Sequence, residues 1–124
     1  MTCNARRGGQ IVSAAMKVHT TLGAGLFEST YRLCLRYELQ SRGLHVEQEV
    51  TLPIVYGEFR IENGYRVDLL VEDLVLVETK SVAKVLPLHQ AQLLAYLKLS
   101  QRPVGLLINF NVPHLRQGIK RMVN

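Results

Sequence analysis

Two carboxylates and one lysine, Asp68, Glu78 and Lys80, stand near the middle of the chain at a spacing that suits metal-assisted hydrolysis. If the two carboxylates lie side by side, their like charges repel, and a divalent cation between them relieves the repulsion. Two carboxylates, a backbone carbonyl and water molecules make an all-oxygen site that suits Mg²⁺. Lys80 can then hold or deprotonate a metal-bound water, or stabilise charge that develops on a phosphate. The alternative is a salt-bridged strand end that faces solvent.

The segments that carry these residues are predicted to form a β-hairpin, because apolar side chains alternate along both of them. A two-residue turn would put Asp68 and Glu78 on opposite faces of the hairpin, whereas a three-residue loop over 72–74 pairs them directly. The three-residue loop also separates apolar from charged side chains more cleanly, so we predict that register. Its apolar face consists of Val67, Leu69, Val71, Val75, Val77 and Thr79.

A helix predicted to start at Pro87 follows the hairpin and carries two further polar candidates. Gln92 and Tyr96 are one turn apart on one face of this helix, where both can donate hydrogen bonds to a phosphate or a metal-bound water. The alternative is structural, a partly buried tyrosine that a nearby glutamine satisfies. The buried side of the helix is predicted to consist of Ala91, Leu93, Leu94, Ala95 and Leu97.

Glu28 is a third carboxylate, at the start of another predicted helix. An acidic side chain in the first helical turn is favourable for its own sake, because the helix dipole is positive at that end. Glu28 becomes a further metal ligand only if its helix packs the stripe from Glu28 to Tyr31 towards the hairpin.

These candidates need a scaffold of helices and strands, which the hydrophobic periods predict. The predicted helices cover residues 11–22, 27–42 and 87–99, and the predicted strands cover 46–56, 65–71, 74–80 and 103–110, with a polar loop at 57–64 and a short last strand in the tail. The order α, α, β, β, β, α, β and a further β predicts an α/β or α+β fold with a mixed sheet. The 124 residues suit a single domain, in which residues 1–10 are expected to be poorly ordered.

The charge of the chain favours a polyanionic partner. Fifteen Lys and Arg against ten Asp and Glu give a formal net charge of +5, and every acidic residue lies between Glu28 and Glu78. Residues 79–124 hold bases and no acid. Such an asymmetry favours nucleic acid, because each phosphate that a base neutralises releases counterions. Simple solubility is the other interpretation of the same charge.

Several classes of protein are excluded by what the sequence lacks. Cys3 and Cys34 are too few and too far apart for a disulfide framework or a zinc site. No apolar run approaches the roughly 18 residues that span a membrane, and the amino terminus has no signal-peptide pattern. The four histidines are scattered, and we assign none of them as a nucleophile or a zinc ligand. We therefore expect a cytoplasmic protein with free thiols, and no membrane partner.

The motifs together resemble the GxxExxY proteins, small prokaryotic domains placed in the PD-(D/E)xK nuclease superfamily. The segment GLFESTY at residues 25–31 matches the signature of that family, and the resemblance extends over about residues 11–124. It includes VHTTLGAGLFESTY, the hairpin VDLLVED…VETK, HQAQLLAYLK and the closing GLLINFNVP…GIKRMVN. Any one of these segments alone would be weak, whereas together they are specific.

The resemblance implies a restriction-endonuclease-like core in which Asp68, Glu78 and Lys80 take the D…ExK positions. It implies that the backbone carbonyl of Thr79 joins the metal ligands, and that Glu28 takes the acidic position on the first core helix. Gln92 and Tyr96 match the Q-x-x-x-Y element of RecB-like and lambda-exonuclease-like members, which helps to position nucleic acid near the metal. A threonine stands between Glu78 and Lys80 where the family usually has an apolar residue.

The function expected from these observations is a Mg²⁺- or Mn²⁺-dependent nuclease that hydrolyses phosphodiester bonds, with DNA favoured over RNA. In this hypothesis Asp68, Glu78 and Glu28 hold the metal and Lys80 acts on the attacking water. The alternative is a non-catalytic nucleic-acid-binding module, or an interaction module of a larger defence or repair complex. Because the core leaves little surface for gripping a duplex, self-association or a partner protein would help in either case.

Overall fold

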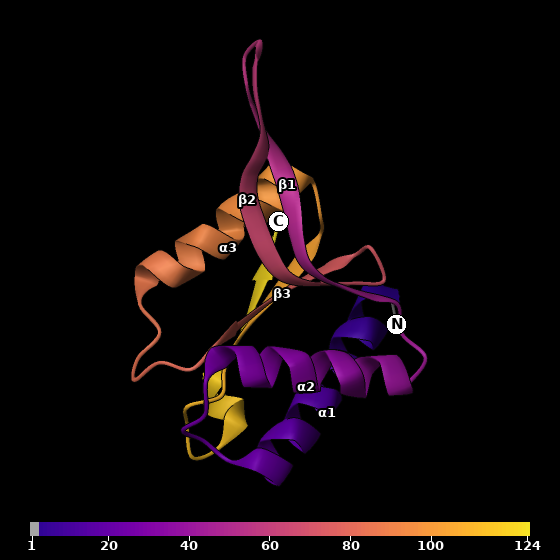
Figure 1. The fold of residues 1–124 in the computed structure, drawn as a ribbon, viewed down its shortest axis with the longest axis vertical. Helices are drawn as coiled ribbons and strands as arrows, with labels where there is room; N and C mark the ends of the chain where they lie inside the picture. Colours follow the sequence, from indigo (N-terminus) through magenta and orange to yellow (C-terminus); the bar gives the residue numbers. More distant parts are fainter. Residues whose placement is uncertain (1–2) are drawn as a thin grey trace.

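The computed structural model describes residues 3–124, which fold into a five-stranded mixed sheet between helices (Figure 1). The elements along the chain are α1 (Cys3–Leu22), α2 (Glu28–Ser41), β1 (Val46–Tyr56), β2 (Phe59–Val71), β3 (Val75–Lys80), α3 (Pro87–Ser100), β4 (Val104–Asn109), a 3₁₀ turn η1 (Leu115–Gly118) and β5 (Ile119–Val123). The strands follow one another in the sheet as β1-β2-β3-β4-β5, with β3 and β4 parallel and the other pairs antiparallel. The predicted order of elements and the mixed sheet are confirmed.

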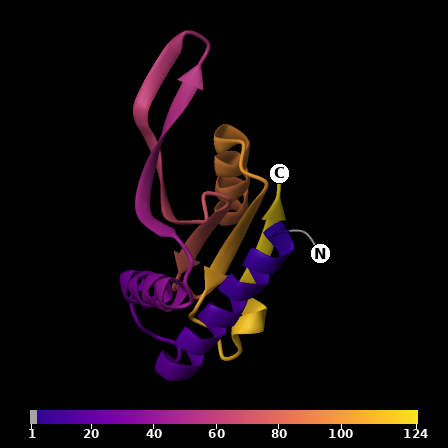
Figure 2. The ribbon, with the colours of Figure 1, turned by 90° about the vertical axis from the view of Figure 1, so that its right-hand side faces the viewer.

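The two faces of the sheet are covered differently, α1 and α2 on one face and α3 on the other (Figure 2). The larger apolar cluster joins α1 and α2 to the strands through side chains such as Tyr31, Val77 and Ile108. The smaller cluster joins α3 to the opposite face through Leu93, Leu97 and their neighbours. Both faces of β3 and β4 are therefore buried, as their continuous apolar runs require.

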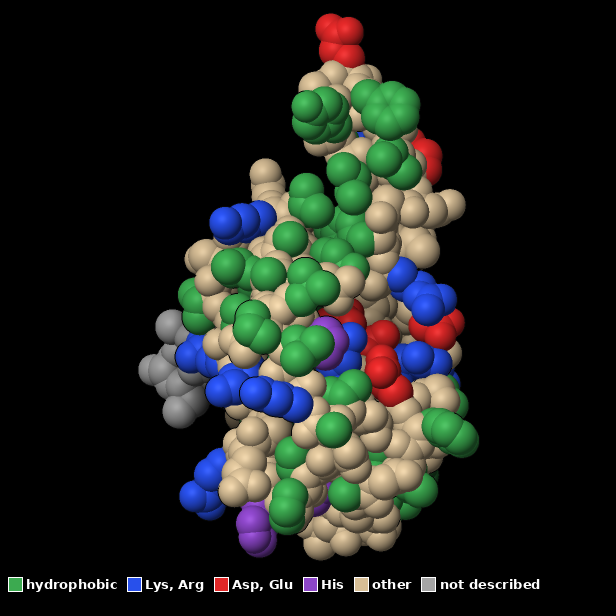
Figure 3. All heavy atoms as spheres, turned by 90° about the vertical axis from the view of Figure 1, so that its left-hand side faces the viewer, with side chains coloured by type: hydrophobic (Ala, Val, Ile, Leu, Met, Phe, Trp, Pro, Cys, Tyr) green, Lys and Arg blue, Asp and Glu red, His purple; other side chains and the backbone are tan. Residues whose placement is uncertain are grey.

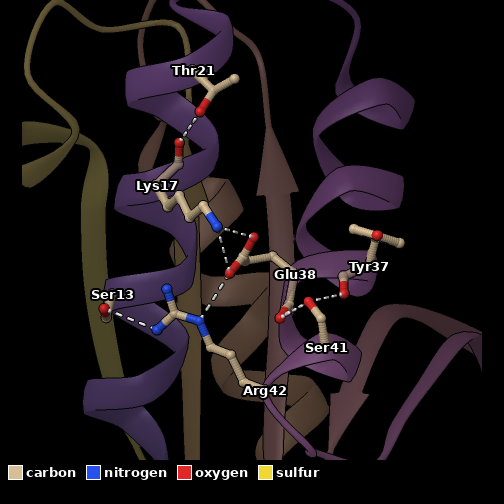
Figure 4. Close-up of polar contacts among 7 residues, drawn as sticks. All are labelled: Ser13, Lys17, Thr21, Tyr37, Glu38, Ser41 and Arg42. Atoms are coloured by element: carbon tan, nitrogen blue, oxygen red, sulfur yellow. Dashed lines mark hydrogen bonds and ion pairs between the residues drawn. The ribbon is translucent and has the colours of Figure 1, made fainter.

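Helices α1 and α2 are joined by a polar network on their outer side (Figure 4). Glu38 of α2 accepts ion pairs from Lys17 of α1 at 3.3 Å and from Arg42 at 3.1 Å, and the Arg42 guanidinium also donates to Ser13. The hydrogen bond from Arg42 and the contacts with Lys17 hold the pKa of the Glu38 carboxyl below its ordinary value, although burial opposes them. This network fixes α2 against α1.

The segment 57–64, predicted to be a loop, is part of a long β-hairpin, and that prediction is wrong. Tyr56 pairs with Phe59 across a two-residue turn, in which Gly57 adopts a positive φ of 61°. Asn63 and Gly64 lie inside β2, so their Asn-Gly pair is no turn signal here. A Cβ on Gly64 would lie 2.5 Å from Cγ1 of Ile54, which is too close for two carbon atoms. Glycine is therefore required at this position of β2, because the side chain of Ile54 packs against it.

Three further details differ from the predictions. Helix α1 begins at Cys3, before the apolar period that predicted it, and includes the two glycines Gly8 and Gly9. Val67 packs in the cluster under α3, whereas Leu69 packs in the cluster under α1 and α2, and the residue between them, Asp68, has no pairing partner in β1. Ala91 and Ala95 of α3 are exposed, so they do not belong to its buried side.

None of the helices in residues 3–124 is long and apolar enough to cross a membrane.

Candidate active site

The hairpin of β2 and β3 brings Asp68 and Glu78 together. Leu69 pairs with Val77 and Val71 with Val75, around a turn at residues 72–74, so the predicted three-residue register is confirmed. Continuing that register by one step places Asp68 opposite Glu78. The regular pairing stops at Leu69 and Val77, one residue before the two carboxylates.

Beyond this point, the two carboxylates accept the hydrogen bonds that backbone carbonyls would accept in a regular pair of strands. The Asp68 amide donates to Glu78 Oε1 at 3.1 Å, and the Thr79 amide donates to Asp68 Oδ2 at 2.9 Å. The Thr79 hydroxyl also donates to Asp68 Oδ2 at 3.1 Å. Among the described residues, the other two oxygens, Asp68 Oδ1 and Glu78 Oε2, accept no hydrogen bond. Each carboxylate thus has one oxygen fixed by backbone and one left for a ligand.

Glu78 is the most perturbed group of the site. Its side chain is buried, with 7% of the residue exposed. Burial, followed by repulsion from Asp68, raises the pKa of Glu78 from 4.5 to about 8, against the opposing effects of the Asp68 amide and of Lys80. At neutral pH, without a cation, one proton therefore remains on this carboxyl. A divalent cation at the same place would displace that proton.

Lys80 supplies the positive charge at the end of β3. It is half-buried, and its charge opposes the rise in pKa of both Glu78 and Glu28. Its carbonyl accepts a hydrogen bond from the Phe110 amide at 2.9 Å, which fixes the strand end against the residue that follows β4. Thr79, between the two charged residues, is fully buried, and its amide and hydroxyl both bind Asp68.

Glu28 begins α2 and faces the same charges. Burial raises the pKa of Glu28, and among the charged groups around it Lys80 has the largest effect and lowers the pKa, followed by Asp68, which raises it, and Arg32, which lowers it. The start of α2 therefore lies within the electrostatic field of Lys80 and Asp68. Figure 3 views a side of the molecule on which acidic, basic and histidine side chains meet near the middle.

The loop before Glu28 is tied down at both sides. The Tyr31 hydroxyl donates to the Gly23 carbonyl at 2.6 Å and accepts from the Leu26 amide at 3.1 Å. The Ser81 hydroxyl, next to Lys80 in sequence, donates to the Leu26 carbonyl at 2.6 Å. The ring of Tyr31 is buried and stacks on Phe110 with 4.5 Å between centroids. These contacts link the position of Glu28 to the end of β3.

Gln92 and Tyr96 come to the edge of the site from α3. Tyr96 is half-buried and stacks on Tyr65 of β2 at 4.5 Å between centroids. Burial raises the pKa of Tyr96, and the charges of Glu78 and Asp68 raise it further, so its hydroxyl lies within the field of the carboxylates. Gln92 is exposed and lowers that pKa as a hydrogen-bonding neighbour.

Two residues near the site were not predicted from the sequence. Arg32 lies one turn after Glu28 on α2 and pairs with Glu49 of β1 at 2.9 Å, with 16% of the arginine side chain exposed. Glu49 has a positive φ of 51° and stands where the β1–β2 pairing skips Asp68. His89 of α3 accepts a hydrogen bond from the Leu86 amide at 3.0 Å and lies close enough to Glu28 to lower its pKa. Only the four-residue spacing from Glu28 to Arg32 was visible in the sequence.

The residues present fit a divalent cation in chemistry but do not form a closed cage. Two free carboxylate oxygens on adjacent strands are hard donors of the kind that Mg²⁺ and Mn²⁺ take. Within residues 3–124, no group of three His, Cys, Asp or Glu side chains is arranged to hold a metal ion. The core of the candidate site is therefore the pair Asp68 and Glu78, with Glu28 and Lys80 beside it.

Comparison with known proteins gives one match. A family model described as the PD-(D/E)XK nuclease superfamily matches residues 5–122, which span all the helices and strands except the first two residues of α1 and the last residue of β5. No curated protein and no solved structure matches the chain.

Proposed function

The chain belongs to the PD-(D/E)XK nuclease superfamily, and from this premise we propose that it is a divalent-metal-dependent nuclease that hydrolyses phosphodiester bonds in DNA. The observation that carries the proposal is the meeting of Asp68 and Glu78 at the point where β2 and β3 stop pairing, with one free oxygen on each carboxylate. A buried glutamate next to a half-buried aspartate and a lysine is a costly arrangement for a merely structural strand end.

Each residue has a proposed role in the reaction. Asp68 Oδ1 and Glu78 Oε2 would hold Mg²⁺ or Mn²⁺, with Glu28 and the Thr79 carbonyl completing the set. When bound, the cation supplies positive charge for the transition state and lowers the pKa of water. Lys80 orients the attacking water or takes its proton, and Gln92 and Tyr96 donate hydrogen bonds to the phosphate backbone.

Within the superfamily, we propose that the chain is one of the GxxExxY proteins of prokaryotes. The sequence resemblance at residues 25–31 supports this, and in the structure the motif residues have these surroundings. Gly25 has a positive φ of 97°, a conformation that side chains disfavour. Tyr31 ties down the loop through its hydroxyl, and Glu28 faces Lys80 and Asp68. The motif therefore shapes the loop that delivers the third carboxylate.

The test is cleavage of linear, circular and single-stranded DNA, and of RNA, in Mg²⁺, Mn²⁺ or EDTA. We expect metal-dependent cutting that Asp68→Asn abolishes. The matched control is Asp73→Asn, an exposed aspartate on the same hairpin whose one ion-pair partner among the described residues is Arg102, at 2.7 Å. Cutting that survives in Asp68→Asn would overturn the proposed site.

A non-catalytic nucleic-acid-binding module is the second candidate. It is favoured by the lack, within the described residues, of a three-ligand metal group. The same experiment separates the two functions. Nucleic-acid binding that is equal in EDTA and in Mg²⁺, unaffected by Asp68→Asn and accompanied by no cleavage, would identify the binding module.

A further inference from the structure

The β1–β2 hairpin extends beyond the rest of the sheet as an arm, defined here as residues 52–64 (Figures 1 and 2). Strand β3 pairs with β2 only over residues 69–71, so the outer part of β2 has β1 as its single partner. A two-stranded hairpin is marginally stable in water by itself. The arm therefore gains stability from anything that packs on it.

One face of the arm is apolar to its end. Ile54 pairs with Ile61 and Tyr56 with Phe59, and residues paired in this way point to the same side of the ribbon. Tyr56 is 81% exposed and Phe59 64% exposed. Ile54 also packs against the cluster under α3, so this apolar face lies on the α3 side of the sheet. Figure 3 shows hydrophobic side chains gathered on the arm, with an acidic side chain at its end.

Helix α3 has a second unpartnered apolar face on that same side. The exposed side chains of Leu88, Ala91, Ala95 and Leu99 follow one another at helical spacing, with the exposed Gln92 as the polar residue among them. The helix buries Leu93 and Leu97 on its inner side, so it is apolar on both sides. At about 1.5 Å per residue, α3 is roughly 21 Å long, and the arm, at about 3.4 Å per residue over residues 59–64, is roughly 20 Å long.

The charges of the two surfaces are complementary. The arm carries Glu58 at its turn, and Arg60 is already paired with Glu62 at 2.7 Å, so the arm has a net negative charge. The outer face of α3 is flanked by bases such as Lys84 and Lys98, in a part of the chain with no acidic residue after Glu78. A negative arm repels nucleic acid and attracts the basic, apolar surface around α3.

We propose that the occupant of both surfaces is a second copy of this chain, in a two-fold dimer in which each arm packs along α3 of the other copy. Both apolar faces lie on the α3 side of the sheet. When two copies face each other on that side, the arm of each copy can contact α3 of the other, which gives two equivalent contacts. This reciprocal packing buries two apolar surfaces on each chain, the arm and the outer face of α3. The total interface is therefore twice as large as the contact of one arm with one helix. It also gives each arm the packing that the isolated hairpin lacks.

The first experiment measures the mass of the full chain by analytical ultracentrifugation across a concentration series. We expect a dimer whose self-association weakens by about tenfold or more in the variant Tyr56→Glu/Phe59→Glu, because central aromatic side chains carry most of the energy of an interface. The matched control is Leu33→Glu/Tyr37→Glu, which changes two exposed apolar residues on α2, at the opposite face of the sheet. Circular dichroism of each variant confirms that it is folded.

A mixing experiment distinguishes this reciprocal packing from other dimers. The arm variant and the helix variant Ala95→Glu/Leu99→Glu each lose both contacts when alone. Mixed together, they retain one intact contact, between the normal arm of one variant and the normal helix of the other. We therefore expect the mixture to form heterodimers more readily than either variant forms homodimers.

Three outcomes would overturn the proposal. The first is a wild-type chain that stays monomeric at every concentration. The second is a dimer that only the α2 control variant disrupts, since the interface would then lie on the α1–α2 face. The third is an arm variant that keeps its dimer but loses nucleic-acid binding, which would make the arm a contact for nucleic acid.

Discussion

Glu78 is a buried carboxyl that shares its surroundings with Asp68 and Lys80, and the balance among these charges sets its proton affinity. The folded protein holds a proton on Glu78 between its ordinary pKa of 4.5 and the raised value of about 8, whereas the unfolded chain has released it. The contribution of Glu78 to stability is therefore complete below pH 4.5 and is lost as the pH rises towards 8.

We predict that, in EDTA, the free energy of unfolding of the wild type falls between pH 5 and pH 8 relative to Glu78→Gln, by an amount on the order of a few kcal/mol. Urea unfolding at each pH measures it. The variant keeps an oxygen for the Asp68 amide and has no proton to lose. The exposed Glu47→Gln serves as the control and should follow the wild type. Parallel profiles for wild type and Glu78→Gln would show that Glu78 titrates normally.

Replacing Lys80 distinguishes a catalytic role from a structural one, because the first predicts a loss of activity and the second a loss of stability. Its backbone is fixed by the Phe110 amide, and its side chain makes no ion pair within the 4.0 Å limit among the described residues. Lys80→Met should therefore leave the thermal midpoint nearly unchanged and reduce the cleavage rate by about 100-fold or more. A variant with full activity would exclude Lys80 from the reaction.

At the scale of elements, the hydroxyl of Tyr31 makes two of the hydrogen bonds that hold the loop before α2. We predict that Tyr31→Phe destabilises the protein by about 1–3 kcal/mol, because the Gly23 carbonyl and the Leu26 amide both lose their partner. Chemical unfolding measures the difference. The control is Tyr37→Phe on the same helix, whose side chain is exposed and should tolerate the change within about 0.5 kcal/mol. Equal effects of the two substitutions would mean that the loop is held by other contacts.

Much of the element order could be predicted from the sequence because apolar residues recur with the periods of helices and strands. The pairing of Asp68 with Glu78 could be predicted because one register of the hairpin separates the apolar side chains from the charged ones. The arm could not, since Glu58, Arg60, Glu62 and Asn63 give residues 57–64 the polarity of a loop. In the hairpin, the charged side chains of Arg60 and Glu62 alternate with Phe59 and Ile61, so they lie on the face opposite to these apolar residues.

Two further features, one beside the site and one at the amino terminus, also escaped prediction for physical reasons. The pairing of Arg32 with Glu49 depends on the irregularity at Glu49, which no residue type announces. The start of α1 was missed because Gly8 and Gly9 have low helix propensity, although their helix continues through them.

At the scale of the whole molecule, the segregation of charge predicts how nucleic acid approaches. Lys84 is exposed in the loop that follows Lys80, at the same end of the sheet as the candidate site. We predict that Lys84→Ala weakens DNA binding and makes it less sensitive to salt, because one fewer counterion is released. Binding titrations at several salt concentrations test it. Lys17→Ala, on the α1–α2 side and paired with Glu38, should have no such effect.

The parallel pairing of β3 with β4 affects the order in which contacts form during folding. The two hairpins on either side of β2 close over short stretches of chain, whereas Val75 meets Val104 only after the whole of α3 has been placed between them. Contacts between distant residues form late in folding, because more chain entropy is lost before they are made. The folding chain should thus acquire Asp68 and Glu78 side by side early, and the Phe110 contact that steadies Lys80 late. The candidate site is therefore complete only when the last strands are in place.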